Sequence, residues 1–463
     1  MISKILIANR GEIALRIART CREMGIRTVV AHSSADRESA AVAYADEAVQ
    51  IGPAPSRHSY LNQAAVVEAA LQAGAGAVHP GYGFLSEDPD FAEICEAHGL
   101  TFIGPDAAVI GRLGDKARAR AIAAEGGLPV LPGTQEAVRG ADEARRIAAE
   151  IGYPVIVKAV AGGGGRGITV VRREADLAAA HAGAEANAQA IFGDPRLYIE
   201  KFLERARHVE AQILADRYGN VVHLGVRDCS VQRRRQKLIE ETPPPGIAPE
   251  TVEEIGMAAA RAAGHAGYTG AGTYEFLLDE NGAFHFMETN CRIQVEHPVS
   301  EMVTGVDLVR EQIRVADGER LALRQPEVVP RGVSVECRVN AEDPARGFVP
   351  APGRIEEFEI PAGPFTRVDT HCRPGDRVTG DYDSLIAKVV VWAPDRVQAV
   401  ARMDRALAEF VIAGPGMATT IPFLRRVLAD PRFRAGTHTT SLVDEMLATE
   451  SCPSTAGAAR SAQ

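Results

Sequence analysis

The sequence predicts an α/β protein made of three parts: an N-terminal domain with a parallel sheet, a smaller domain built around a glycine-rich loop, and a large C-terminal domain of mixed strands and helices. Three observations lead to this prediction. Strand-like and helix-like segments alternate over the first hundred residues, four consecutive glycines lie between apolar segments at 162–165, and two further apolar segments flank Asn281-Gly282. A chain of 463 residues suffices for about three domains.

The first part, residues 1–114, alternates between the two kinds of element. Such alternation is typical of a parallel sheet with helices on its faces. The first strand–helix turn, Asn-Arg-Gly-Glu-Ile, does not carry the three glycines of the dinucleotide fingerprint, which argues against a nicotinamide cofactor. We expect strands at 4–9, 27–33, 77–83 and 99–105, and helices at 12–25 and 64–77.

The second part, residues 115–203, contains the glycine loop and a linker at 129–133. Residues 204–447 mix strands and helices and form the largest domain. The end of the chain, 448–463, is rich in Ser, Thr, Ala and Gly and is expected to be disordered. For the second part we expect strands at 153–160, 168–172 and 196–202, and a helix at 176–192.

Charge and composition narrow the class of protein. The formal net charge is −10, which argues against nucleic acid as the main partner because phosphate backbones bind basic faces. No run of about 18 apolar residues occurs, so no membrane span is expected. The seven cysteines are scattered without a Cys-x-x-Cys pair, which favours a reducing compartment. No apolar signal-peptide core follows the start, and a cytoplasmic protein is expected.

The glycine loop lies between two strands and not between a strand and a helix. Glycine backbone N–H groups can approach phosphate oxygens closely, so such a loop can cover a bound nucleotide. The alternative is a mobile surface hairpin. Lys158 at the end of the preceding strand and Lys116 in the earlier Gly-Asp-Lys favour an anion, because a lysine among apolar residues is costly to bury unpaired. Either lysine could instead extend to water.

Two glutamates are expected to face each other across a hairpin. If Asn281-Gly282 forms a two-residue turn, Glu275 is opposite Glu288. Directly opposed like charges destabilise a sheet, unless a divalent cation lies between them. The sequence therefore predicts a Mg²⁺ site, and a solvated face is the alternative.

Beyond Glu288, polar residues recur at every second position, which in a strand would place them on one face. The order of metal-type ligands, arginine and glutamate indicates an anion site with a base beyond the metal. By the same alternation, a basic run at 227–237 puts Arg233, Arg235 and Lys237 on one side as a possible clamp on an anionic substrate. Solvated faces are the alternative for both runs, and Arg338 beside Glu336 could be an ordinary ion pair.

Taken together, these segments resemble the biotin carboxylases, the ATP-grasp component of biotin-dependent carboxylases. The similarity runs from Lys4 to about Gly414 and has the motifs in one order. The motifs are KILIANRGEIALRIAR, HPGYGFLSE, GGGGRG, RHVEAQILAD, RDCSVQRR, GAGTYEFL, RIQVEHPVSEM, VECRVNAEDP and YDSLIAK.

The resemblance implies a three-domain ATP-grasp enzyme and a role for each matching residue. The glycine loop would close as a lid over ATP. Glu296 matches the base that deprotonates bicarbonate, and Arg338 the residue that stabilises the biotin enolate; both are expected to be catalytic, with Arg292 and Lys237. The bicarbonate site would comprise Lys237, Arg292, Gln294 and Val295, and the Mg²⁺ or Mn²⁺ ligands would be Glu275, Glu288 and Asn290. The positions matching the ATP site are Lys116, Lys158, Gly164, Gly165, Glu200, Lys201, Leu203, His208 and Arg235, the last standing where many members carry histidine.

The implied reaction is the first half-reaction of acetyl-CoA carboxylase. Bicarbonate attacks the γ-phosphate of ATP, carboxyphosphate forms and breaks down, and biotin is carboxylated. No Met-Lys-Met tripeptide occurs in the chain, so biotin is expected on a separate carrier protein and the carboxyltransferase on another polypeptide. Arg19, Glu23 and Arg367 match a dimer contact of bacterial members, which implies a homodimer. Propionyl-CoA or pyruvate carboxylase, another ATP-grasp ligase and a non-catalytic nucleotide-binding scaffold are the alternatives.

Overall fold

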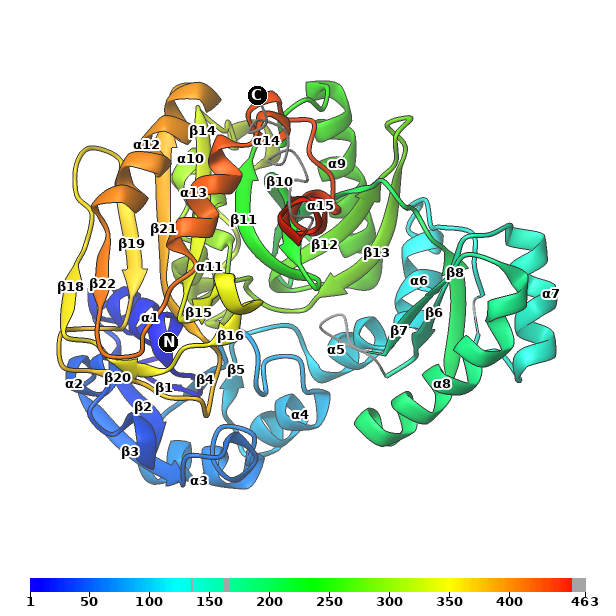
Figure 1. Ribbon diagram of the computed structural model, residues 1–463. Helices are drawn as coiled ribbons and strands as arrows, with labels where there is room; N and C mark the ends of the chain where they lie inside the picture. The colour runs from blue at the N-terminus through cyan, green and yellow to red at the C-terminus, as the bar shows by residue number, and fades with distance from the viewer. Residues whose placement is uncertain (135, 162–166, 452–463) are drawn as a thin grey trace, which may run out of the picture.

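The computed structural model of the chain describes residues 1–134, 136–161 and 167–451 (Figure 1). The predicted glycines of the lid, Gly164 and Gly165, lie outside these described residues, as does the end of the chain from 452. Residues 448–451, expected in a disordered tail, instead end a helix, α15 (Leu442–Ser451). Within the described ranges, no helix is both long and apolar enough to cross a membrane.

The N-terminal part has a parallel sheet, as predicted. Its order is β3-β2-β1-β4-β5 and each neighbouring pair is parallel. Leu6 of the first strand packs into one apolar core and Ile5 and Ile7 into another, as expected for a strand covered on both faces. The elements are β1 (Lys4–Ile7), α1 (Gly11–Glu23), β2 (Arg27–Ser33), α2 (Ala40–Tyr44), β3 (Glu47–Gly52), α3 (Gln63–Gln72), β4 (Ala77–His79), α4 (Pro89–Ala97), β5 (Thr101–Phe102) and α5 (Ala107–Gly114).

The segment with the glycine loop forms a lobe that stands away from the rest of the molecule (Figure 1). Its three strands form an antiparallel sheet of order β7-β6-β8, and it has an apolar core of its own that includes Ala148, Val157, Leu177 and Ile199. The elements of the lobe are α7 (Ala141–Ile151), β6 (Val155–Ala159), β7 (Ile168–Val171), α8 (Glu174–Phe192) and β8 (Leu197–Lys201). The preceding helix, α6 (Lys116–Glu125), instead packs into the apolar core that contains Leu6.

The remaining chain is organised around an eight-stranded sheet of order β13-β12-β9-β10-β11-β14-β21-β19 within the described residues. Its pairs are antiparallel, so the mixed character expected of this part comes from the helices around the sheet. The strands are β9 (Arg207–Ala215), β10 (Val221–Arg233), β11 (Gln236–Thr242), β12 (Gly270–Leu278), β13 (Phe284–Asn290), β14 (Val333–Asn340), β19 (Thr366–Thr370) and β21 (Leu385–Ala393).

Helices and short strand pairs complete this part. Two apolar cores that contain residues of the N-terminal sheet also contain residues of β9 and β12, so these two parts are packed together. The helices are α9 (Pro249–Ala266), α10 (His297–Thr304), α11 (Leu308–Ala316), α12 (Arg396–Glu409), α13 (Ile421–Ala429) and α14 (Pro431–Ala435). The short pairs are β15 (Glu342–Asp343) with β16 (Val349–Pro350), β17 (Gly353–Arg354) with β20 (Arg377–Val378), and β18 (Glu357–Glu359) with β22 (Val411–Ala413).

Candidate active site

The predicted pairing of Glu275 with Glu288 is confirmed, but the predicted turn is wrong. Near the hairpin end Leu278 pairs with Phe284, and the Asp279 amide donates to the carbonyl of Ala283, so the turn is longer than Asn281-Gly282. A register shift between Glu275 and Phe276 then moves the pairing by one residue. This bulge restores the pairing that the shorter turn would have given.

The Lys237 ammonium group is the centre of a buried cluster. Its Nζ donates to Glu210 Oε2 at 2.6 Å, Glu296 Oε1 at 2.6 Å and Glu275 Oε1 at 3.1 Å. Burial opposes the charge, but the three carboxylates outweigh it and hold the pKa of Lys237 well above its usual value. In turn, burial would raise the pKa of Glu296, yet Lys237, Arg338 and Arg227 lower it well below its usual range.

The polar series after Glu288 converges on this cluster, although the predicted strand does not continue. β13 ends at Asn290, and Glu296 precedes the first residue of α10. Asn290 Nδ2 and Gln294 Nε2 donate to Glu275 Oε1 at 2.7 and 3.0 Å. Arg292 donates to Gln294 Oε1 at 3.0 Å, Asn290 Oδ1 at 3.1 Å and Glu87 Oε2 at 2.7 Å. Loop geometry and ion pairs therefore replace strand alternation in gathering these side chains.

Arg338 bridges two carboxylates at the other end of the cluster. Its Nε donates to Glu240 Oε1 at 2.6 Å and an Nη atom donates to Glu296 Oε2 at 2.9 Å. These are the ion pairs that the structure gives Arg338, in place of the alternative pair with Glu336. Arg338 and Lys237 thus hold the two oxygens of Glu296 from opposite sides.

The residues predicted to bind nucleotide lie between the lobe and the eight-stranded sheet. Lys158 and Arg120 both make ion pairs with the buried Glu200. Lys116 Nζ donates to Glu288 Oε2 at 2.7 Å, and His208 Nε2 lies 2.7 Å from Glu275 Oε2. Burial alone would lower the pKa of Lys116, but Glu288 raises it. Cations therefore line the path from the lobe to the paired glutamates.

Two other predicted nucleotide residues, Lys201 and Leu203, and Val295 of the predicted bicarbonate site have different contacts. Lys201 ends β8, and its Nζ donates to the carbonyls of Gly152 and Tyr153 at 3.0 Å. Leu203 is half-buried in the connection from β8 to β9. Val295 is in the segment before α10, and its carbonyl accepts from Lys388 Nζ at 2.9 Å. Lys388 is fully buried and also pairs with Glu12 at 2.9 Å.

The predicted one-sided alternation of Arg233, Arg235 and Lys237 is wrong. Arg234 and Arg235 have φ of 47° and 66°, which reverses the chain between β10 and β11. Arg233 packs over Phe348, whereas Lys237 points into the carboxylate cluster. At the start of the basic run, Arg227 is fully buried and donates to Glu210 Oε1 at 2.6 Å. Arg227 and Lys237 of the basic run therefore belong to the buried cluster, whereas Arg233 lies outside it.

Sequence reasoning missed several buried charges of the site. Glu210, Arg227 and Glu240 are fully buried; Glu210 contacts Lys237 and Glu240 contacts Arg338 directly, whereas Arg227 contacts Glu210. The available signal was a charged residue inside an apolar run, as in His-Val-Glu-Ala-Gln-Ile-Leu around Glu210, because buried charge requires a partner. Two potential metal-ligand groups lie at this place, His208, Glu210, Glu275 and Glu210, Cys229, Glu296. Lys237 Nζ already donates to carboxylates of both groups, and they differ from the predicted metal set.

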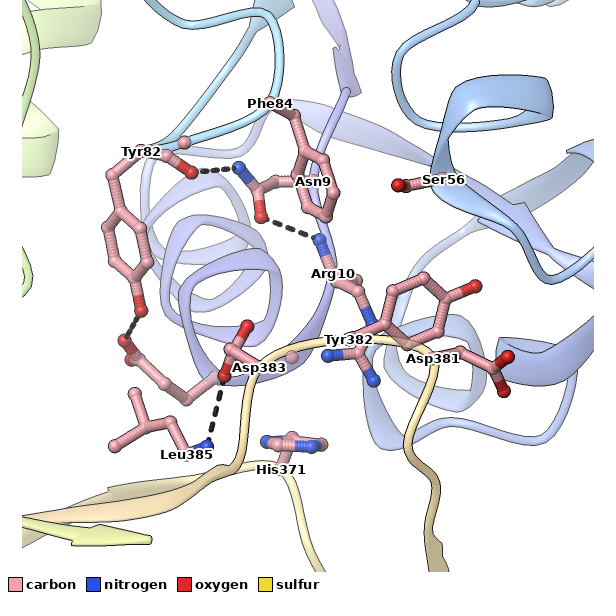
Figure 2. Close-up of a pocket in the computed structure, with 13 residues that line it drawn as sticks. Asn9, Arg10, Ser56, Tyr82, Phe84, His371, Asp381, Tyr382, Asp383 and Leu385 are labelled. Atoms are coloured by element: carbon pink, nitrogen blue, oxygen red, sulfur yellow. Dashed lines mark hydrogen bonds between the residues drawn. The ribbon is translucent and has the colours of Figure 1, made fainter. Parts of the chain in front are cut away.

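A cavity of about 340 Å³ lies beside the site, between the start of α1, residues 82–84 and residues 381–385 (Figure 2). Figure 2 shows Arg10 against the ring of Tyr382, and the guanidinium carbon lies 4.1 Å from the ring centre. Tyr82 donates to Glu12, which is bound by Lys388. The cavity wall is therefore connected through Lys388 to the carbonyl of Val295.

Comparison with protein families covers nearly all of the chain. Residues 1–110 match the biotin carboxylase N-terminal domain, residues 336–445 the biotin carboxylase C-terminal domain, and residues 115–324 the ATP-binding domain of the carbamoyl-phosphate synthase L chain. The biotin carboxylase of Nostoc sp. is 54% identical over 443 residues, 96% of this chain and 99% of that protein. A pyruvate carboxylase subunit of Methanothermobacter thermautotrophicus is 51% identical over 96% of this chain and 90% of that protein.

Solved structures give the same result. The biotin carboxylase of Campylobacter jejuni is 46% identical, with a TM-score of 0.94 over 96% of this chain and 99% of that one. The biotin carboxylase domain dimer of 2-oxoglutarate carboxylase from Hydrogenobacter thermophilus, a complex with MgADP and bicarbonate, is 48% identical with a TM-score of 0.93 over 96% of this chain and 98% of that one. The chain therefore belongs to the biotin carboxylase family of ATP-dependent, ATP-grasp ligases.

Proposed function

We propose that this chain carboxylates biotin on a separate carrier protein with ATP and bicarbonate, as the first half-reaction of acetyl-CoA carboxylase. The observation that carries the proposal is the cluster in which Lys237 and Arg338 hold the two oxygens of Glu296. A bicarbonate bound between these groups would be held by two cations and would lie within reach of a carboxylate. Arg292 and Gln294 complete the anion site, with Val295 beside them.

We assign the nucleotide phosphates to the cations on the lobe side. Lys116 and Lys158 each pair with one glutamate and can exchange it for a phosphate oxygen, since phosphate attracts the same donors. Glu200, Lys201, Leu203, His208 and Arg235 belong to the proposed nucleotide site, and the glycine loop would close over it. The proposed lid domain, 115–203, lies between the N-terminal domain, 1–114, and the C-terminal domain, 204–447.

Glu275, Glu288 and Asn290 fit a divalent metal ion such as Mg²⁺ or Mn²⁺ by their chemistry. Two carboxylates and one amide offer hard oxygen ligands, and the side chain of Glu288 is 30% exposed toward the site. The ion would supply positive charge to the phosphate oxygens at which the bond breaks. In the structure Lys116 is the cation that balances the charge of Glu288.

Glu296 is the proposed base for bicarbonate. Its lowered pKa means that it is ionised at neutral pH and can accept a proton, but also that it is a weak base while Lys237 and Arg338 hold it. Bicarbonate that takes over donors from these two side chains would raise the basicity of Glu296. The deprotonated bicarbonate oxygen then attacks the γ-phosphorus, ADP leaves, and carboxyphosphate forms. Arg338 next serves the transfer of the carboxyl group to biotin.

The remaining parts of the proposal concern partners. The carrier and the carboxyltransferase would be other polypeptides, with acetyl-CoA as the acceptor and fatty acid biosynthesis as the context. Pyruvate and propionyl-CoA are the alternative acceptors, and the relative named as part of a pyruvate carboxylase keeps the first of them open. We propose a homodimer, as in the 2-oxoglutarate carboxylase domain structure. A cytoplasmic location is supported by the free state of the six cysteines that the structure describes.

The test is phosphate release from MgATP by the purified protein, with bicarbonate present or absent and with or without free biotin. We expect release that depends on bicarbonate and is stimulated by biotin. Cleavage that depends on neither would favour another ATP-grasp ligase, and ATP binding without cleavage would favour a scaffold. Adding purified carrier proteins and acyl-CoA acceptors with their carboxyltransferases then identifies the acceptor.

A further inference from the structure

Two buried glutamates that the proposed mechanism does not use face each other behind Arg338. Glu240 of β11 and Glu336 of β14 are directly paired across the antiparallel ladder, so their side chains share one face of the sheet. Both are fully buried. Glu240 Oε2 and both carboxyl oxygens of Glu336 have no hydrogen-bond partner in the described part of the chain.

Among the described residues, the charges around this pair leave one carboxyl group without a cation. The neighbouring titratable or charged groups come from β10, β11, β14, β21 and the segment before α10. Arg338 divides its donors between Glu240 and Glu296, and Lys388 donates to Glu12 and to the carbonyl of Val295. The groups are Cys229, Lys237, Glu296, Cys337, Arg338 and Lys388.

Two ionised carboxylates in this place would be strongly disfavoured. Like charges that share a desolvated site raise the affinity of one member for a proton. Burial raises the pKa of Glu336 well above its usual value, despite Lys388, and Glu240 adds to the shift. Burial likewise raises the pKa of Glu240, to about 7, although Arg338 opposes this. Both shifts agree with the geometry.

We propose that Glu240 and Glu336 share one proton, and that the single negative charge left on the pair positions Arg338 for the carboxylation of biotin. The proton resides mainly on Glu336, because no cation of the described residues donates to it, and the charge mainly on Glu240, because Arg338 does. The guanidinium group is then stretched between Glu240 and Glu296 and is fixed at both ends. This inference rests on the proposed function for the role of Arg338, but not for the shared proton.

The positioning role depends on having one charge and not two or none. With both carboxyls neutral, Arg338 would keep only Glu296 as its partner and would turn toward it. With both ionised, the pair would draw Arg338 away from Glu296. Glu240 and Glu336 are therefore positioning residues, and the charge on Glu240 sets where Arg338 presents its donors.

Difference infrared spectroscopy tests the shared proton independently of any assay of enzyme activity. At neutral pH we expect the carbonyl-stretch band of a protonated carboxylic acid in the wild type, and its loss in Glu336→Gln. The exposed Glu359→Gln on β18 is the matched control and should keep the band. Identical difference spectra for the wild type and Glu336→Gln would overturn the shared proton.

Stability against pH gives a second readout of the proton. A carboxyl whose pKa is raised on folding binds more protons in the folded state, so stability falls as pH rises from its ordinary value toward the folded value. Glu336→Gln removes this loss. The melting temperature of the variant relative to the wild type should therefore increase as pH rises above about 4.5. A difference that is constant with pH would contradict the inference.

The role of the charge is tested by two variants with the same side-chain change, of which only Glu240→Gln replaces the carboxylate that pairs with Arg338. Glu240→Gln removes the partner of Arg338 and should raise the KM for free biotin by about 10- to 100-fold, the effect of losing a charged hydrogen bond. Glu336→Gln keeps that partner and should raise KM much less, while flattening the alkaline side of the pH profile. Equal KM values in the two variants would overturn the positioning role. A wild type without biotin-stimulated ATP cleavage would refute the proposed function, and the infrared result would still decide the shared proton.

Discussion

Replacing Lys237 by methionine should destabilise the centre of the eight-stranded sheet, because the variant keeps three buried carboxylates and removes the ammonium group that they share. The distances from Nζ to Glu210, Glu275 and Glu296 are between 2.6 and 3.1 Å, and the lysine side chain is only 11% exposed. Breaking a buried pair by removing one partner costs about 3–5 kcal/mol. Each carboxylate keeps another ion-pair partner, Arg227, His208 or Arg338, which argues against a larger figure.

The sign of the pH dependence follows from the same groups. Burial would raise the pKa values of Glu275 and Glu296, but Lys237 and its neighbours hold them below their usual range. Their contribution to stability is therefore present above a pH of about 4.5 and is lost as pH falls through their folded pKa values. Without Lys237 this contribution disappears at neutral pH. The deficit of the variant should be large at pH 7–8 and should shrink in acid, where protonation removes the uncompensated charge.

Native-state hydrogen exchange measures this deficit locally, which suits a chain of several parts better than a global unfolding curve. Peptides from β9 and β12 should exchange about 100- to 5,000-fold faster in Lys237→Met. Lys4→Met is the matched control: Lys4 lies 2.9 Å from Glu47, but Glu47 is 36% exposed and also paired with Arg27, so the effect should be much smaller. Equal exchange in the two variants, or a deficit that does not change with pH, would refute the reasoning.

The remaining predictions concern turnover and nucleotide affinity. Glu288→Gln should abolish bicarbonate-dependent phosphate release with an unchanged circular dichroism spectrum; turnover at the wild-type rate would refute the metal assignment. Arg292→Ala should lower kcat about 10- to 100-fold, more than it changes the Kd of ATP by calorimetry, and an unchanged rate would remove Arg292 from the anion site. Lys158→Met should weaken ATP binding by about tenfold, because it removes a cation assigned to the phosphates and leaves Arg120 as the ion-pair partner of Glu200 among the described residues. An equal Kd would contradict the phosphate role of Lys158.

The parallel sheet could be predicted because it depends on local patterns, whereas the site depends on contacts between distant segments. Alternation correctly indicated four strands of this sheet and missed β3 (Glu47–Gly52). It failed after Asn290, where the Cys291 amide donates to Glu87 Oε1 and turns the chain. It failed again at Arg234-Arg235, because neither residue is one of the usual turn formers with positive φ. Turn chemistry overrode periodicity at both places.

The Glu275–Glu288 pairing shows a different limit of sequence reasoning. The prediction used a two-residue turn, and the structure reaches the same pairing through a longer turn and a bulge. Nothing in the sequence around Met287 signals a bulge, because its side chain is compatible with either register. The prediction also placed one common cation between the two glutamates, whereas the structure pairs Glu275 with Lys237 and Glu288 with Lys116; the metal site itself stays a prediction.

Functional groups of the site balance one another in pairs: Lys116 with Glu288, Lys158 with Glu200, and Lys237 and Arg338 with Glu296. A substrate anion competes with these carboxylates for the same cations. Transfer of Lys116 to an ATP phosphate would release Glu288 in the same step, and a released carboxylate in a desolvated site requires a new cation. A divalent metal that arrives with the nucleotide meets this requirement. The pairing therefore favours binding of ATP and metal as one complex over binding of either alone.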